Sequence, residues 1–138
     1  MSGTLIITVW DRDPDYLGID IRAANERYSG TARLYAGINS MSELADVVSG
    51  FPRAPHDERK YVIGTHRPDF VGGFCSLQFR CTDGAGHARV EITVEDDDTY
   101  HEPANASFGF PVFAAGIDRF VLMLRQIDQN LINEAELS

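Results

Sequence analysis

Residues 75–94, CSLQFRCTDGAGHARVEITV, contain the clearest fold signal in the chain. Apolar and polar side chains alternate before the DGAG segment, and the alternation resumes after it. The apolar series is Cys75, Leu77, Phe79, Cys81, Ala88, Val90, Ile92 and Val94. Because successive strand residues face opposite sides of a sheet, each half predicts a strand with one buried face. The Asp-Gly step favours a tight reversal, so the stretch predicts an antiparallel hairpin.

The same alternation occurs on both sides of this hairpin. Towards the N-terminus it predicts three strands, with apolar faces formed by Leu5, Ile7 and Val9, by Leu17, Ile19, Ile21 and Ala23, and by Ala32, Leu34 and Ala36. A further strand is expected around residues 61–65. A last one carries Ala106, Phe108, Phe110 and Val112, and its Pro111 suits an edge position because proline has no amide hydrogen to donate.

Two segments change to a helical period. In residues 39–52, NSMSELADVVSGFP, apolar residues follow i, i+3, i+4 and i+7 spacing. Ser40 and Glu43 fit a capping box at its start, and Gly50 suits the left-handed position after its end. A second helix is expected from about Ala114 to Asn133, with an apolar face formed by Ile117, Phe120, Val121, Leu124 and Leu131.

These elements predict an α+β fold: a two-layer domain with a mainly antiparallel sheet of about six to seven strands and two helices on one face. The chain has 138 residues, which suits one domain over residues 1–138. Hydrophobic residues make up 43% and charged residues 24%, as in ordinary globular proteins.

The composition also bears on the compartment and the partners. The apolar run at the N-terminus follows no basic segment, and no stretch approaches the ~20 apolar residues that cross a bilayer. Cys75 and Cys81 would lie ~20 Å apart on one strand, too far for a disulfide, so we expect reduced cysteines in a cytoplasmic protein. A net charge of -9 disfavours nucleic acid and membrane surfaces and favours a basic protein partner, although acidic charge can also serve solubility alone.

Residues 11–18, DRDPDYLG, begin like a calcium-binding loop. Such a loop needs glycine at its sixth position and a bidentate glutamate at its twelfth. Tyr16 and Arg22 occupy these positions here, and Arg22 would bring positive charge towards the ion. We therefore expect a turn between two strands and no metal.

No motif for catalysis or cofactor binding is found. The DGAG segment leads into a strand, whereas a phosphate-binding loop leads into a helix N-terminus. The histidines His56, His66, His87 and His101 lie in or beside loops, without the spacing of a metal site. The alternation places Cys81 in the core, away from the exposure that a nucleophile needs. We expect a protein without enzymatic activity, with no catalytic residue and no cofactor.

The order of strands places several acids at one end of the sheet. If successive strands form hairpins and the short helix returns the chain, two acidic loops meet there: one contains Asp11, Asp13 and Asp15, and the other Glu95, Asp96, Asp97 and Asp98. Clustered carboxylates repel one another, so this end is either a solvated rim or a surface completed by a cationic partner. These seven residues are the candidate partner-binding residues.

The segments YSGTARLYAGINSMSELADVVSGFP (28–52) and FVGGFCSLQFRCTDGAGHARVEI (70–92) resemble small bacterial proteins with a similar strand, helix and hairpin pattern over about residues 17–95. Some similar families look like immunity proteins of polymorphic-toxin systems. The resemblance implies a cytoplasmic protein that inactivates a toxin by binding it. An acidic surface would attract a basic toxin by electrostatic steering.

Two other functions remain open. One is a small ligand-binding domain or enzyme with a site between the sheet and the helices, for which convergence of His66, His101 and loop aspartates would speak. The other is a homodimer formed through the outer sheet face, where Ile6, Trp10 and Tyr35 are expected.

Overall fold

The computed structural model describes residues 2–64, 73–97 and 102–138. Their elements are, in chain order, β1 (Gly3–Arg12), β2 (Tyr16–Asn25), β3 (Ser29–Gly37), α1 (Ser40–Val48), β4 (Glu58–Gly64), β5 (Phe74–Cys81), β6 (Ala88–Asp96), β7 (Ala104–Val112), α2 (Ala114–Asp128) and β8 (Glu134–Leu137). The predicted α+β class, antiparallel pairing and two helices are confirmed. His66, Asp98 and His101 lie outside the described residues.

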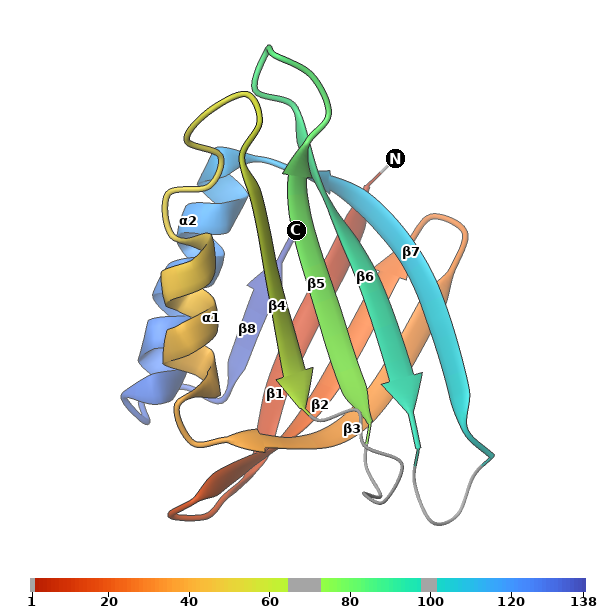
Figure 1. The fold of residues 1–138 in the computed structure, drawn as a ribbon. Coiled ribbons are helices and arrows are strands. Elements are labelled where there is room, and N and C mark those ends of the chain that lie inside the picture. Colours follow the sequence, from red (N-terminus) through yellow and green to blue (C-terminus); the bar gives the residue numbers. More distant parts are fainter. Residues whose placement is uncertain (1, 65–72, 98–101) are drawn as a thin grey trace.

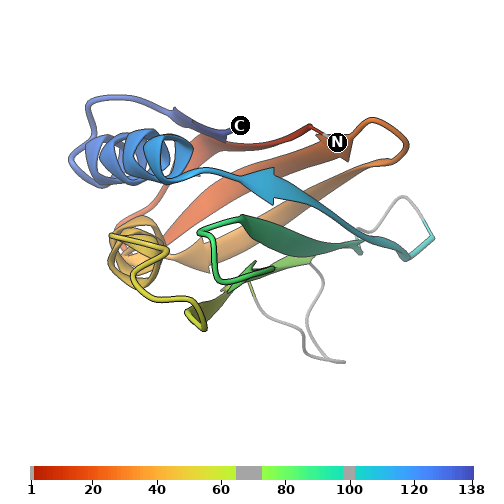
Figure 2. The ribbon, with the colours of Figure 1, turned by 90° about the horizontal axis from the view of Figure 1, so that it is seen from above.

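The strands are divided between two four-stranded antiparallel sheets, ordered β3-β2-β1-β8 and β4-β5-β6-β7. Figure 1 shows the second sheet in front of the first, and Figure 2 shows the helices together at one side of the pair. Each helix carries the chain between the sheets, because α1 joins β3 to β4 and α2 joins β7 to β8. Period-two alternation predicts which side of a strand is buried, but it does not assign strands to one sheet or to two.

One hydrophobic core connects both sheets with both helices. In the central hairpin the predicted pairing is confirmed, with Phe79 opposite Val90 and both fully buried. The rings of Phe79 and Phe51 pack edge to face, with centroids 5.7 Å apart. The helices contribute the fully buried side chains Met41, Leu44, Ala45, Val48, Ile117, Phe120, Leu124 and Ile127. The space between sheets and helices is therefore occupied by packed apolar side chains.

The start of α1 differs from the prediction, whereas its end agrees. The predicted capping box is wrong: Asn39 is the N-cap residue, and no side chain caps the helix. Ser40 is buried inside the first turn, and Glu43 accepts a hydrogen bond of 2.8 Å from the Tyr61 hydroxyl. Gly50 takes the expected left-handed conformation at φ +75°. A tertiary partner on β4 thus engages the glutamate that the local pattern had assigned to a cap.

The second helix is shorter than predicted. It ends at Asp128, and Asn130 adopts a left-handed conformation at φ 61° that turns the chain back. Residues 134–137 then form β8, which pairs with β1 and buries Ala135 and Leu137. Leu131, predicted on the apolar helix face, is 66% exposed. Four residues give too short an alternation to separate this strand from the helical pattern before it.

The predicted grouping of connections at the two ends of the molecule is confirmed for the described residues. At the lower end in Figure 1, β1 turns into β2, β4 ends, β6 ends and β7 begins. The β2–β3 and β5–β6 turns lie at the upper end. Neither α1 nor α2 is long and apolar enough to span a bilayer.

Candidate functional site

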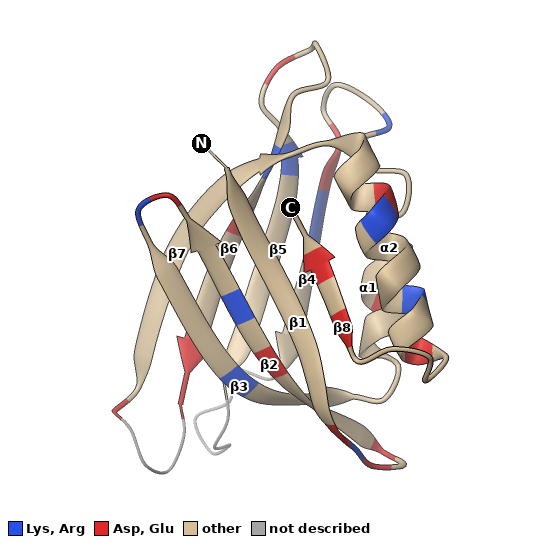
Figure 3. Ribbon diagram, turned by 180° about the vertical axis from the view of Figure 1, so that it is seen from behind, with Lys and Arg blue, Asp and Glu red and all other residues tan. Residues whose placement is uncertain are grey.

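The candidate acids lie at the same end of the molecule but in two separate groups. Asp11, Asp13 and Asp15 belong to the β1–β2 hairpin, whose tip projects past the rest of the first sheet (Figure 3). Glu95 and Asp96 end β6, and Asp97 follows them. In Figures 1 and 3 the hairpin tip and the end of β6 occupy opposite corners of this end. The structure therefore does not join them into one acidic patch.

In the β6 group, Asp96 makes a contact between the two sheets. Its Oδ1 accepts a hydrogen bond of 3.2 Å from the backbone N–H of Arg33 on β3. Asp96 is half-buried, as are Glu95 and Asp97. The carboxylate of Asp96, a predicted partner-binding residue, thus forms a hydrogen bond between the two sheets.

In the hairpin group, Asp13 shapes the turn while Asp11 and Asp15 remain exposed. The Asp13 Oδ1 accepts a 3.1 Å hydrogen bond from the backbone N–H of Asp15, and the Asp13 N–H donates to the carbonyl of Tyr16 at 3.0 Å. The negative charge of Asp13, followed by burial and the charge of Asp11, raises the pKa of Tyr16 above its ordinary value. The field of the hairpin carboxylates therefore reaches the neighbouring aromatic ring.

A β-bulge at Trp10 determines how the hairpin side chains are oriented. Val9 pairs with Ile19 and Asp11 with Gly18, so Trp10 is an additional residue in β1. Bulges redirect side chains, and here both Trp10 and Asp11 lie over Gly18. A Cβ at Gly18 would lie only 2.8 Å from the indole, so glycine leaves the space in which the ring rests.

Trp10, Tyr16 and Tyr35 form an aromatic cluster on the outer face of the first sheet. The Tyr35 ring lies 5.7 Å from that of Trp10 and 5.4 Å from that of Tyr16, both edge to face. The side chains stay 39%, 38% and 42% exposed, respectively. Edge-to-face pairs contribute about 0.5–1.5 kcal/mol each beyond the area they bury, so the rings hold one another in place.

Arg33 adds a cation to this cluster. Its guanidinium carbon lies 4.6 Å from the centroid of the Trp10 ring. Its Nε and Nη2 donate to the two carboxylate oxygens of Asp20 at 2.8 and 3.1 Å. These contacts hold the pKa of Arg33 above its ordinary value, chiefly through the hydrogen bond to Asp20. The outer face thus already combines an aromatic ring, a guanidinium and a carboxylate.

Arg12 fixes the base of the hairpin. It pairs with the buried Leu17 and donates to the carbonyls of Ile127 and Ile132 at 3.2 and 3.1 Å. It also donates to the side-chain oxygens of Asn130 and Asn133 at 2.6 and 3.0 Å. The hairpin is therefore bonded to the last turn of α2 and to the chain between α2 and β8.

Sequence reasoning found part of this surface. Asp11, Asp13 and Asp15 were predicted as partner-binding residues, and Trp10 and Tyr35 were placed on the outer face. Tyr16, Gly18 and Arg33 were missed. In the sequence, Tyr16 stands out only as the residue that replaces the glycine of a calcium-binding loop. The usable signal was the cross-strand pairing of Gly18 with Tyr35, which requires the register of β2 and β3.

The cysteines and His87 are either buried or in contact with a structural partner. Burial raises the pKa of the Cys75 thiol to about 12, and Cys81 is half-buried with its Sγ 3.4 Å from the carbonyl of Ala54. His87 contacts Asp83 at 2.6 Å in the β5–β6 turn and lowers the pKa of that carboxyl. Among residues 2–64, 73–97 and 102–138, no group of three or more His, Cys, Asp or Glu side chains could hold a metal ion.

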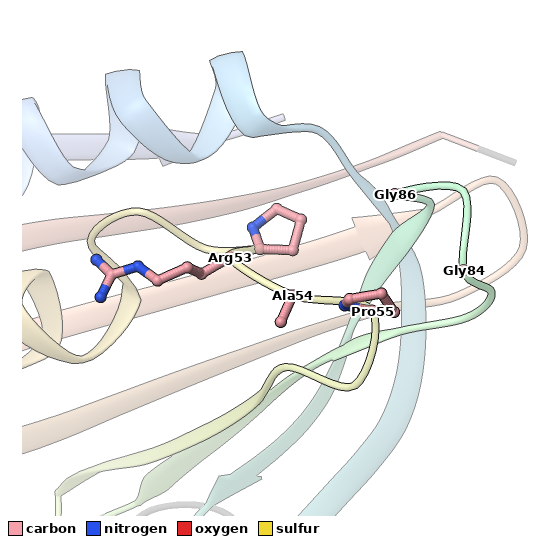
Figure 4. Close-up of a pocket in the computed structure, with 6 residues that line it drawn as sticks. Arg53, Ala54, Pro55, Gly84 and Gly86 are labelled. Carbon is pink, nitrogen blue, oxygen red and sulfur yellow. The ribbon is translucent and has the colours of Figure 1, made fainter.

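Pockets lined by described residues include two that lie away from the aromatic cluster. One lies between the α1–β4 connection and the β5–β6 turn, where Pro52, Ala54, Pro55, Gly84 and Gly86 line it (Figure 4). Arg53 also borders it, but its guanidinium points away from the two glycines. The second is lined by residues 2–4, residues 24–26 and Ser138.

Comparison with known proteins found no matching family model, curated protein or solved structure.

Proposed function

We propose that this chain is a non-enzymatic, immunity-like protein of the bacterial cytoplasm that binds and neutralises a basic protein such as a toxin. The acidic β1–β2 hairpin is the surface that engages the partner. The observation that carries the proposal is the projection of the exposed Asp11 and Asp15 past the sheet, beside exposed aromatic rings.

The net charge of the chain supports this function. At -9, the molecule attracts a cationic protein over distances comparable with the Debye length of about 8 Å at 0.15 M salt. Charges on a projecting hairpin act early in an encounter and increase the association rate, while aromatic contacts reduce dissociation. The hydrogen bonds of Arg12 hold the base of the hairpin in place. The hairpin therefore loses little conformational entropy when a partner binds to it.

The test is capture of the partner from the native host, together with assay of the neighbouring gene's product for toxicity. The triple variant Asp11→Asn, Asp13→Asn, Asp15→Asn removes three charges, and asparagine at position 13 keeps the oxygen that accepts the turn hydrogen bond. We expect this variant to bind the captured protein at least about tenfold more weakly and to no longer protect the host against the toxic neighbour.

The matched control removes three exposed acids elsewhere: Glu58→Gln on β4, Asp118→Asn on α2 and Glu136→Gln on β8. It changes the net charge equally and should bind nearly as well as wild type. Equal losses in both triple variants, or a host with no toxic neighbour and no high-affinity protein partner, would contradict the proposal.

The ligand-binding or enzymatic alternative has no supporting observation among the described residues. Among the described residues, the space between sheets and helices, where its site is expected, is filled by the hydrophobic core.

A further inference from the structure

We propose that the aromatic cluster, with the carboxylates of the β1–β2 hairpin, is an anchor site for an arginine side chain presented by an exposed basic segment of a protein partner. This inference rests on the proposed function and names the contact that would give it affinity and specificity.

The rings have the features of a binding hot spot. Trp10, Tyr16 and Tyr35 come from three adjacent strands, pack edge to face and stay between 38% and 42% exposed. Tryptophan, tyrosine and arginine are the residues that dominate the energy of protein interfaces. Because the rings are already held on a sheet, binding a partner costs little side-chain entropy.

The chain itself shows which ligand chemistry suits this surface. Arg33 places a guanidinium over Trp10 while its Nε and Nη2 donate to the two carboxylate oxygens of Asp20. Tyr16 shares the hairpin turn with Asp13, whose N–H donates to its carbonyl, and Asp11 lies on the facing strand opposite Gly18, so a second guanidinium at Tyr16 would again find carboxylates close to an aromatic ring. Arginine suits such a site better than lysine, because its planar head stacks on rings and forms two parallel hydrogen bonds to a carboxylate.

The charge distribution selects the occupant. Arg33 and Asp20 on this face are already paired with each other. Asp11 and Asp15 at its hairpin edge, in contrast, are exposed, so two copies of this chain that meet through the hairpin would bring like charges together. A basic segment gains the opposite interaction at the same positions. The outer face of the second sheet offers no equivalent among its described residues, since polar pairs such as Arg89–Glu91 and Thr93–Ser107 cover it.

The experiment uses an octa-arginine peptide as the probe and an octa-lysine peptide of equal charge for comparison. Trp10 is the only tryptophan in the sequence, so its emission reports directly on the cluster. Calorimetry supplies the affinity. We expect octa-arginine to cause a saturable change in emission and to bind several-fold more tightly than octa-lysine.

Three variants locate the contact. Tyr35→Ala should weaken octa-arginine binding about fivefold, and Tyr35→Phe, which keeps the ring, should restore it. Tyr28→Ala removes a tyrosine that is 61% exposed in the β2–β3 turn, just before β3 and at the opposite end of that strand from Tyr35, and should bind as wild type. Circular dichroism of each variant checks that the fold is intact.

The outcomes separate this inference from the proposed function. Equal affinity for the two peptides, with no effect of Tyr35→Ala, overturns the arginine anchor but leaves acid-driven partner binding standing. Unchanged binding in the triple asparagine variant of the hairpin contradicts the proposed function itself. Dimerisation in sedimentation experiments that Tyr35→Ala abolishes would assign the face to a second copy and overturn the anchor.

Discussion

Gly18 allows the Trp10 indole to lie across the first sheet. The nearest atoms to a Cβ at this position are Cε2 and Cζ2 of Trp10, both at 2.8 Å. Gly18→Ala should therefore displace the ring into solvent and shift its emission to longer wavelength. Stability should fall by only about 1 kcal/mol, because an exposed side chain can move aside. Emission spectra and urea unfolding test this, and an unshifted spectrum would contradict the placement of the indole over Gly18.

Asp57 gives a pH dependence whose sign follows from its partners. It accepts hydrogen bonds from the Arg59 guanidinium at 3.1 and 2.8 Å and from the Arg53 backbone N–H at 2.8 Å. The Arg59 contact, aided by that of Arg53, holds the pKa of Asp57 below its ordinary value. A lowered folded-state pKa contributes stability at higher pH, and this contribution is lost as pH falls through that pKa.

We therefore expect Asp57→Asn to be less stable than wild type at pH 7, with a gap that narrows below about pH 4. Urea unfolding of both proteins at pH 7 and again below about pH 4 measures the gap. A gap that is constant across this range would show that the ionised carboxylate is not what stabilises the fold.

Among the elements, Arg12 connects the β1–β2 hairpin to the last turn of α2 and to the chain between α2 and β8. Arg12→Ala removes four donated hydrogen bonds, two of them to backbone carbonyls. We expect a loss of about 2 kcal/mol in the free energy of unfolding. Hydrogen exchange should accelerate in β8, and Arg12→Lys should restore only part of the loss, because lysine lacks the planar fork. Unchanged exchange in β8 would contradict the connection.

Some elements follow from local sequence patterns, and others depend on distant pairing. The hairpin of β5 and β6, the edge position of β7 and the left-handed Gly50 were predictable, because alternation, Pro111 and glycine each reflect local physics. The short β8 and the bulge at Trp10 were not, since both depend on pairing between distant segments. The exposure of Asp11 and Asp15 could be predicted, but the aromatic cluster beside them required the register of three strands.

At the scale of the whole molecule, the two sheets share one core and should unfold together. Phe79 is fully buried in β5 of the second sheet. Trp10 lies in β1, so its emission reports on unfolding of the first sheet. Phe79→Ala should cost about 3–5 kcal/mol, because it leaves a cavity in the shared core. Trp10 emission and far-ultraviolet circular dichroism should shift to the same lower urea midpoint. Separate midpoints for the two signals would show that the sheets are independent.

The net charge of the whole molecule attracts a basic ligand from a distance, and the projecting hairpin is the place where that ligand binds. Affinity for a basic probe should therefore fall as salt rises, while the aromatic contribution remains. Octa-arginine titrations at low and high salt, followed by calorimetry, measure both parts. A salt-independent affinity would contradict the role of the hairpin carboxylates.

The central claim is that a basic ligand binds the β1–β2 hairpin and the adjoining aromatic face. The most direct measurement is amide chemical-shift mapping of the labelled protein during titration with octa-arginine. We expect the largest shifts in residues 10–18 and 33–37. Shifts concentrated on the second sheet or on α2, or scattered evenly over all acidic residues, would contradict this claim.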